Sequence, residues 1–237
     1  MAGTDWVAVD WGTSNVRAWG IAADGSQTFS ANSDKGMGKI VRADYPAVLA
    51  GLVGERASGN LDVVICGMAG ARQGWMEAPY FETPAALGQL ATRAVAPEGA
   101  DKRFRPRILP GVCQRSAGGE DVMRGEETQV LGLLALQPGF EGTAILPGTH
   151  SKWIEIRDGR IVRFQSAMTG ELYEILSLHS VLRHSLTGEQ NGPQTEAGAA
   201  EGIDAGLGHP ELVTSLAFRA RAAALLSGKG PDWCSGY

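Results

Sequence analysis

An acidic residue followed by a turn of glycine and hydroxyl residues stands near the N-terminus, in the stretch VAVDWGTSNVRAW. Gly12 lets the backbone approach an oxyanion, and the hydroxyls of Thr13 and Ser14 can donate to phosphate oxygens. Asp10 would repel phosphate unless a cation came between them, so we expect it to hold Mg²⁺ through water. Arg17 follows on the returning segment, where its charge suits a phosphate. The stretch predicts a phosphate-binding turn, and a plain hairpin turn with a polar tip is the alternative.

A second turn of the same design occurs in the stretch AILPGTHSKW. We expect Gly148 and Thr149 to bind phosphate as well, whereas His150 is as well suited to a structural hydrogen bond as to a phosphate. Two such turns, each opening one half of the chain, predict two facing hairpins that hold a polyphosphate between related domains. The sequence contains neither a Walker A nor a GxGxxG pattern, which disfavours P-loop and Rossmann folds. The four histidines lack metal-ligand spacing, so we expect no zinc site.

Short strands and helices must position these turns, and the apolar patterns predict an alternation of the two. Strands are expected at 6–10, 16–22, 28–30, 61–66 and 107–109, and as a second hairpin at 143–146, 152–156 and 161–165. Helices are expected at 45–57, 83–94, 121–136, 172–186 and 211–226, with a loop rich in glycine, glutamate and alanine between the last two. We expect no strand or helix in the final segment, 232–237.

Composition and charge restrict the class of protein. The chain has 237 residues, 43% of them hydrophobic, which is enough for a sizeable core. Its net charge of -5 argues against a binder of nucleic acids. Three cysteines without paired spacing fit a reducing compartment, and no apolar run is long enough to cross a membrane. We expect a cytoplasmic protein that acts on small molecules.

Several blocks of sequence together carry a resemblance to a known family. They are DWGTSNVR, CGMAGARQGW, DVMRGEETQVLGLL, LPGTHSKW and MTGELYEIL. In this order they resemble bacterial 2-dehydro-3-deoxygalactonokinases, from about Trp6 to the last residue. The resemblance implies an α/β, actin-like ATPase (ribonuclease H-like) fold, with two related lobes of mixed sheets flanked by helices. It also implies transfer of the ATP γ-phosphate to the 6-hydroxyl of 2-dehydro-3-deoxy-D-galactonate in galactonate catabolism.

The two turns, each opening one half of the chain, divide it into an N-terminal lobe, 1–140, and a C-terminal lobe, 141–237. Members of the family continue beyond Tyr237 with a glycine-rich stretch that contacts adenosine. We therefore expect the second lobe to be incomplete. The alternative function is a truncated or non-catalytic protein that binds the sugar acid or the nucleotide on the same scaffold. An ATPase whose conformational cycle is its output is a third hypothesis, and a homodimer is an open option.

Phosphoryl transfer calls for a carboxylate that takes the hydroxyl proton. In related sugar kinases this base lies near the start of a helix such as the one expected over 121–136. Asp121 is the first candidate and Glu126 the second. The alternative is that Asp121 is an N-cap and that the acids of the first turns only favour the helix dipole.

A sugar acid brings a carboxylate that needs a cationic partner. Arg72 follows Gly67 and Met68 in a glycine-rich loop after a predicted strand, where its guanidinium suits a bidentate contact. Trp75 is a candidate to stack on the apolar face of the sugar. The alternatives are a surface ion pair for Arg72 and a place in the core for Trp75.

Overall fold

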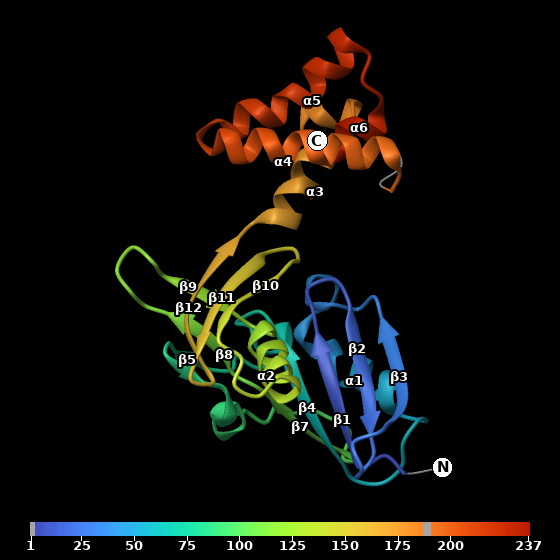
Figure 1. The fold of residues 1–237 in the computed structure, drawn as a ribbon. Helices are drawn as coiled ribbons and strands as arrows, with labels where there is room; N and C mark the ends of the chain where they lie inside the picture. The colour runs from blue at the N-terminus through green and yellow to red at the C-terminus, as the bar shows by residue number, and fades with distance from the viewer. Residues whose placement is uncertain (1–2, 187–190) are drawn as a thin grey trace. The chain divides into compact units, whose positions relative to one another are not determined.

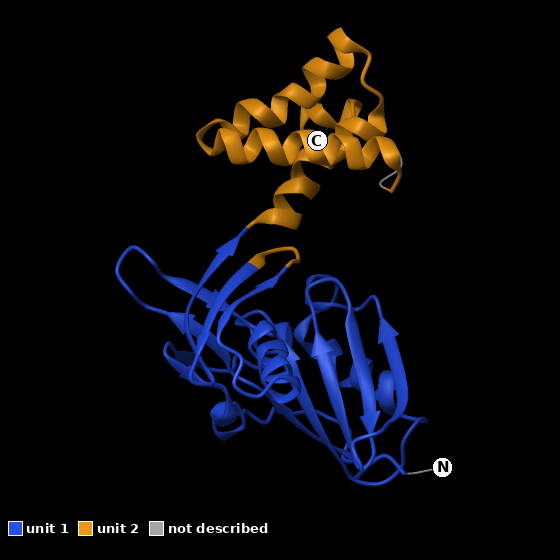
Figure 2. Cartoon of the chain, viewed as in Figure 1, with its two compact units in different colours: residues 1–146, 152–167 blue, residues 147–151, 168–237 orange. Residues whose placement is uncertain are grey.

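The computed structural model describes residues 3–186 and 191–237. By its packing the chain divides into two compact units, which Figure 2 colours separately. Unit 1 is residues 1–146 with 152–167, and unit 2 is residues 147–151 with 168–237. The expected lobes, 1–140 and 141–237, stay a prediction. The mixed sheets and flanking helices of a mixed α/β fold are present (Figure 1).

The first sheet of unit 1 has five strands in the order β3-β2-β1-β4-β7. Strand β1 is antiparallel to β2 and parallel to β4, and β4 is parallel to β7. Parallel neighbours end at the same edge of a sheet, so the residues after β1 and those after β4 lie close together. The predicted strands 6–10, 16–22, 28–30 and 61–66 are confirmed, and the strand predicted at 107–109 begins three residues earlier. The strands are β1 (Trp6–Trp11), β2 (Val16–Ile21), β3 (Gln27–Ser33), β4 (Leu61–Gly67) and β7 (Phe104–Ile108).

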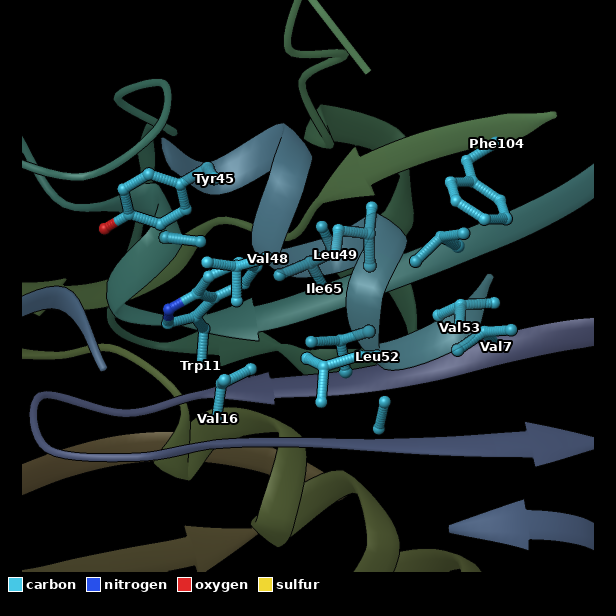
Figure 3. Packing of buried hydrophobic residues seen from close by; sticks show 14 of the residues in the cluster. Val7, Trp11, Val16, Tyr45, Val48, Leu49, Leu52, Val53, Ile65 and Phe104 are labelled. Carbon is cyan, nitrogen blue, oxygen red and sulfur yellow. The ribbon is translucent and has the colours of Figure 1, made fainter. Parts of the chain in front are cut away.

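Helix α1 (Tyr45–Val53) packs on one face of this sheet. Its apolar residues recur at helical spacing, and Leu49 and Leu52 lie among Trp11 and Ile65 in Figure 3. Burying one such side chain contributes about 1.5–3 kcal/mol before the conformational entropy is subtracted. The helix confirms the prediction for its first nine residues. The opposite face of the sheet carries Asp10, and it meets another helix, α2 (Glu126–Leu136).

Two smaller sheets complete unit 1, in the orders β10-β11-β12-β6 and β5-β8-β9. Their inward side chains share a second apolar cluster with Val130 of α2 and with Leu87 and Leu90. The alternation of buried and exposed residues along β11 and β12 matches a sheet with one face in the core. The strands are β5 (Tyr80–Glu82), β6 (Ala85–Ala86), β8 (Gly111–Gln114), β9 (Asp121–Met123), β10 (Gly142–Leu146), β11 (Ser151–Arg157) and β12 (Arg160–Ala167).

The helix expected over 83–94 is wrong. Ala85 and Ala86 pair with β12, and a 3-10 helix follows at Leu87–Arg93. Leu87 and Leu90 are both buried, at a spacing of three, which a 3-10 helix places on one side. Sheet pairing thus overrides a pattern that reads as helical in the sequence alone.

The helix expected over 121–136 begins five residues later. Asp121 to Met123 form β9, which pairs with β8, and the helix starts at Glu126. Gly125 separates the two elements with a φ of 117°, a conformation that a helix does not contain. Asp121 is therefore not the N-cap of this helix.

Unit 2 is helical, with a small core made by Ala220, Trp233 and Cys234. The loop expected between the last two helices contains helix α4, because Gly198 and Gly202 let the backbone of α6 approach it closely. Residues 187–190 of that expected loop lie outside the described residues. The final segment also forms a helix, contrary to expectation. The helices are α3 (Thr169–His179), α4 (Pro193–Gly208), α5 (Val213–Ser227) and α6 (Pro231–Gly236). Among the helices of residues 3–186 and 191–237, none is long and apolar enough to cross a membrane.

Candidate active site

Asp10 occupies the carboxyl end of β1, on the face that meets α2. The sheet register places it opposite Arg17 of β2 and Cys66 of β4, so the three side chains lie on one face. Together with Gly125, just before α2, and Thr128 of α2 they line a pocket of about 380 Å³. The pocket therefore joins a carboxylate and a guanidinium at the edge where two parallel strands end.

Burial affects both titratable groups on the β1 and β4 strand ends. Desolvation raises the pKa of Asp10 above its ordinary value, and the nearby Arg17 guanidinium works in the opposite direction. Burial also raises the pKa of the Cys66 thiol, and the charges of Asp10 and Glu127 raise it further. A carboxylate whose charge is poorly solvated binds a cation more readily than an exposed one, since the cation replaces lost hydration.

The first turn (residues 12–15) closes on itself through the Gly12 N–H, which donates to Asn15 O at 2.8 Å. Its carbonyls accept from a neighbouring segment: Met37 N donates to Gly12 O at 3.0 Å and Gly38 N to Thr13 O at 2.9 Å. In the part of the chain that the structure describes, the N–H groups of Thr13 and Ser14 have no acceptor, and both residues are exposed. Such free N–H groups form an anion-binding concavity.

The start of α2 contains a buried carboxylate that sequence reasoning did not select. Glu127 is 0% exposed, and both of its oxygens accept from Gly125 N, at 2.9 and 2.8 Å. Burial raises its pKa to about 7. This bond holds Gly125 beside Gly67, where a Cβ on Gly125 would lie 3.4 Å from the Gly67 Cα. Its position three residues before the buried Val130 is the only signal in the sequence that this acid faces inward.

Glu126 is the first residue of α2 and is only partly buried. Its Oε2 accepts from Arg124 N at 3.1 Å, so the carboxylate lies back over the turn that precedes the helix. Gly125, next to it in the chain, lines the same pocket as Asp10. Glu126 is thus the residue that comes immediately after a pocket residue in the sequence.

Asp121 is bound into the sheets. Its Oδ2 accepts from Ser166 N at 2.6 Å and its Oδ1 from Ser166 Oγ at 2.7 Å. Ser166 also accepts from Lys152, a buried lysine of β11. Asp121 lines a different pocket, of about 810 Å³, from the one that Asp10 lines. The network connects β9, β11 and β12, which is a structural role.

The loop after β4 begins at Gly67, where the backbone needs a glycine. Its φ is 86°, and a Cβ there would lie 2.5 Å from Trp11 O. Arg72 is 82% exposed in its side chain and makes a weak ion pair with Glu77 at 3.6 Å. This is the surface ion pair that the sequence left as the alternative, and it leaves the guanidinium open to solvent.

Trp75 does not face the solvent at this loop. It is 6% exposed, packs against Trp11 and Tyr45, and donates its indole N–H to Glu98 O at 3.2 Å. The core alternative describes it correctly, and stacking on a sugar finds no support here. Tryptophan suits both a core and a sugar face, so its type alone did not decide between them.

Arg42 anchors the same loop and was not selected from the sequence. Its Nε donates to Gly74 O at 2.9 Å and its Nη2 to Arg72 O at 2.8 Å. The two bonds fix the backbone from which the Arg72 side chain projects. Nothing in the local sequence around Arg42 indicates this, because its partners are 30 and 32 residues away.

The second turn (residues 148–150) belongs to unit 2, where it packs on the start of α3. Gly148 O accepts from Gly170 N at 3.2 Å, and Thr149 O accepts from Glu171 N at 3.0 Å. His150 Nε2 lies 2.6 Å from Glu171 Oε2, the structural contact that the sequence allowed for. Gly148, Thr149 and His150 are all exposed.

A protein-family model described as 2-keto-3-deoxy-galactonokinase matches residues 10–237, which include both turns. The chain belongs to this family. A probable 2-dehydro-3-deoxygalactonokinase of Rhizobium meliloti (strain 1021) is 42% identical over 224 residues, covering 94% of this chain and 72% of the relative. The 2-dehydro-3-deoxygalactonokinase of Escherichia coli (strain K12) is 34% identical over 223 residues, covering 93% and 72%. The resemblance seen in the sequence is confirmed.

A solved structure agrees with this assignment. A crystal structure is known of a protein from Sinorhizobium meliloti that is named provisionally as a 2-dehydro-3-deoxygalactonokinase. It superposes on this chain with a TM-score of 0.89 at 40% identity. The match covers 98% of this chain and 77% of the other. The mixed α/β architecture of this chain is therefore also found in a solved structure that carries the family's enzyme name.

In this member of the 2-keto-3-deoxy-galactonokinase family the structure brings some predicted residues together and not others. Asp10 and Arg17 share one pocket, and the first turn follows directly on β1. Asp121 lines another pocket and Trp75 is in the core. In the described residues no group of three or more histidine, cysteine or acidic side chains is placed to hold a metal ion. A single carboxylate such as Asp10 is still enough for Mg²⁺, which keeps several waters and often takes one or two carboxylates beside substrate phosphates.

Proposed function

We propose that this chain transfers the γ-phosphoryl group of ATP to the 6-hydroxyl of 2-dehydro-3-deoxy-D-galactonate, in the cytoplasm. Membership of the family supports the substrate and the reaction. The observation that carries the proposal is the first turn, shortly after the partly buried Asp10: its carbonyls are bonded, while among the described residues the N–H groups of Thr13 and Ser14 have no acceptor. A turn of this kind suits a polyphosphate.

Each residue of the site has a role in this reaction. The N–H groups and hydroxyls of Thr13 and Ser14 hold phosphate oxygens, and Gly12 allows their approach. Arg17 balances phosphate charge, and Asp10 holds a Mg²⁺ ion through water. When bound, Mg²⁺ neutralises charge on the phosphates. Gly148, Thr149 and His150 bind phosphate from the second turn.

Glu126 is our first candidate for the general base, ahead of Asp121. As the 6-hydroxyl oxygen bonds to the γ-phosphorus, the bond from phosphorus to the bridging oxygen of ADP breaks, and the hydroxyl proton passes to a carboxylate. Glu126 is next in the chain to Gly125, which lines the same pocket as Asp10. Asp121, in contrast, already accepts two hydrogen bonds from Ser166. Among the described residues Glu126 accepts one hydrogen bond, from Arg124 N to Oε2, which leaves its Oε1 to take a proton.

The loop after β4 is the proposed sugar-acid site. The Arg72 guanidinium is exposed and its ion pair with Glu77 is long, so a carboxylate can replace Glu77 at little cost. Gly67 and Met68 supply the backbone beside it. The wider proposal of an actin-like ATPase fold is supported by the order β3-β2-β1-β4-β7, in which an antiparallel meander continues into parallel strands.

The test is a coupled assay of ADP release with Mg-ATP and 2-dehydro-3-deoxy-D-galactonate, its gluconate epimer and plain galactonate. We expect turnover with the first substrate and a loss on the order of 10²-fold in kcat/KM for Asp10→Asn. Asp5→Asn is the matched control, because Asp5 is an exposed carboxylate just before β1. Turnover that is equal in the Asp10→Asn and Asp5→Asn variants would refute the role of Asp10. Binding of the sugar acid without any turnover would instead support a non-catalytic binding protein.

A further inference from the structure

We propose that Gly36 and Gly170 are positioning residues that aim the N–H groups of the two turns at the phosphates of ATP. The proposal rests on the function proposed above and deepens it, since it names what makes each turn an anion site. Neither glycine stands within the turn that it positions, and the pattern of the turns does not point to either.

Backbone geometry links a bonded carbonyl to a free N–H. In a trans peptide unit the C=O and the following N–H lie in one plane and point in opposite directions. A donor that fixes the carbonyl of Gly12 therefore aims the N–H of Thr13 to the other side. Fixing the carbonyl of Thr13 does the same for the N–H of Ser14.

The segment that supplies these donors in unit 1 is 36–38. Met37 N and Gly38 N bond the carbonyls of Gly12 and Thr13, and Gly36 N donates to Ser14 O at 3.3 Å. Gly36 lies so close to the turn that a Cβ would be 2.4 Å from Thr13 O and 2.4 Å from the Ser14 carbonyl carbon. Any side chain at 36 must push the segment away from the turn and release its carbonyls.

Unit 2 repeats this arrangement with different elements. Gly170 N and Glu171 N, at the start of α3, bond the carbonyls of Gly148 and Thr149. These bonds aim the N–H groups of Thr149 and His150 outward. A Cβ on Gly170 would lie 2.7 Å from Gly148 O and 3.1 Å from the Thr149 Cα. The same solution thus occurs twice, once from the start of a 3-10 helix (Met37–Lys39) and once from the first residues of an α-helix.

The chain offers a graded series for the test in unit 1. Gly36→Ala forces a contact of 2.4 Å, Gly38→Ala one of 3.3 Å to Thr13 O, and Gly51→Ala in α1 meets nothing within 4 Å. We would measure the affinity for Mg-ATP by calorimetry, the KM for ATP and for the sugar acid, kcat, and the melting temperature. We expect Gly36→Ala to weaken ATP binding by about 10-fold or more, because at least one charge-assisted hydrogen bond is misdirected. Gly38→Ala should weaken it less, and Gly51→Ala not at all.

Unit 2 offers its own test variant and control. Gly170→Ala should weaken ATP binding while Gly206→Ala, in α4 with nothing within 4 Å, should not. In every variant with weakened ATP binding the KM for the sugar acid should stay close to wild type. That split separates a positioning role from a general loss of folded protein, which would lower kcat and leave both KM values unchanged.

Two outcomes overturn the inference. One is an unchanged ATP affinity in both Gly36→Ala and Gly170→Ala, and Gly38→Ala decides for unit 1 if Gly36→Ala does not fold. The other is a wild-type chain that binds no ATP. If the wild type binds ATP but does not turn over any of the sugar acids, the proposed kinase function fails while the glycine series still tests the inference.

Discussion

A fully buried carboxylate changes its proton affinity when the chain folds, and Glu127 is such a group. Its pKa rises from 4.5 to about 7, mainly because burial disfavours the charged form. Between those two values the folded chain binds the proton that the unfolded chain has released. Stability from this group is therefore full below about pH 4.5 and is lost as the pH rises through about 7. A difference of that size corresponds to about 3 kcal/mol.

Glu127→Gln should remove this dependence, because the amide oxygen can still accept from Gly125 N without a charge. We expect the free energy of unfolding of the variant, relative to wild type, to rise by about 3 kcal/mol between pH 4.5 and 8. Denaturant titrations at several pH values measure the difference. Glu120→Gln, at an exposed carboxylate, is the control and should show no such trend. Parallel curves for wild type and Glu127→Gln would contradict the prediction.

At the scale of residues, the sequence predicted chemistry better than location. Asp10, Arg17 and the turn between them could be predicted from the sequence because all of them belong to one hairpin, where residue type and spacing indicate the site. Glu127 and Arg42 were not, since their roles depend on partners brought in by packing. Trp75 was selectable for its type, but its burial follows from Trp11 and Tyr45, which lie far from it in the sequence.

Among the elements, the connection of β9 to β12 by Asp121 invites a direct test against its predicted role as the base. Asn at 121 has no charge and one acceptor oxygen instead of two, so the N–H and the hydroxyl of Ser166 can no longer each bond to a separate carboxylate oxygen. We expect Asp121→Asn to lower the free energy of unfolding by about 1.5–3 kcal/mol, the contribution of a hydrogen bond to a charged group.

The kinetic result for the same variant separates the two roles. With a structural role, kcat of the folded variant stays within about tenfold of wild type, whereas loss of a general base lowers kcat by about 10²–10⁴-fold. Glu126→Gln is the matched comparison and should show the larger loss. A large loss in Asp121→Asn with unchanged stability would restore Asp121 as the base.

Elements with one dominant pattern were predictable, and those decided by tertiary contacts were not. The strands β1, β2 and β4 and helix α1 follow from β-branched runs and from helical spacing of apolar residues. The segment 83–94 failed because two of its residues pair with a strand more than 70 residues later. Helix α4 was missed because its glycines, which weaken a helix locally, are needed for close contact with α6.

For the molecule as a whole, the two units differ in how much apolar surface they bury. Unit 1 has two large clusters, whereas the cluster in unit 2 has three fully buried members. Helices α3 and α5 expose large apolar side chains. Among them are Leu172, Ile175, Leu178, Phe218, Leu225 and Leu226.

This difference predicts uneven local stability. We expect backbone amides of α3 and α5 to exchange with deuterium markedly faster than those of β1 and β4, since opening unit 2 exposes less buried surface. Hydrogen exchange followed by mass spectrometry on wild-type protein measures this, with the exposed turn at 24–26 as the fast reference. Equal protection in α3 and β4 would contradict the prediction.

The position of Cys66 gives the protein a chemical reporter of its own. All three cysteines are free thiols, and maleimides react with the thiolate. Burial and two neighbouring carboxylates raise the pKa of Cys66, which lowers the share of thiolate and slows its alkylation. Any movement of α2 away from the sheet hydrates this thiol and speeds its alkylation. The rate of labelling at Cys66 therefore reads out the opening of the Asp10 pocket without an introduced cysteine.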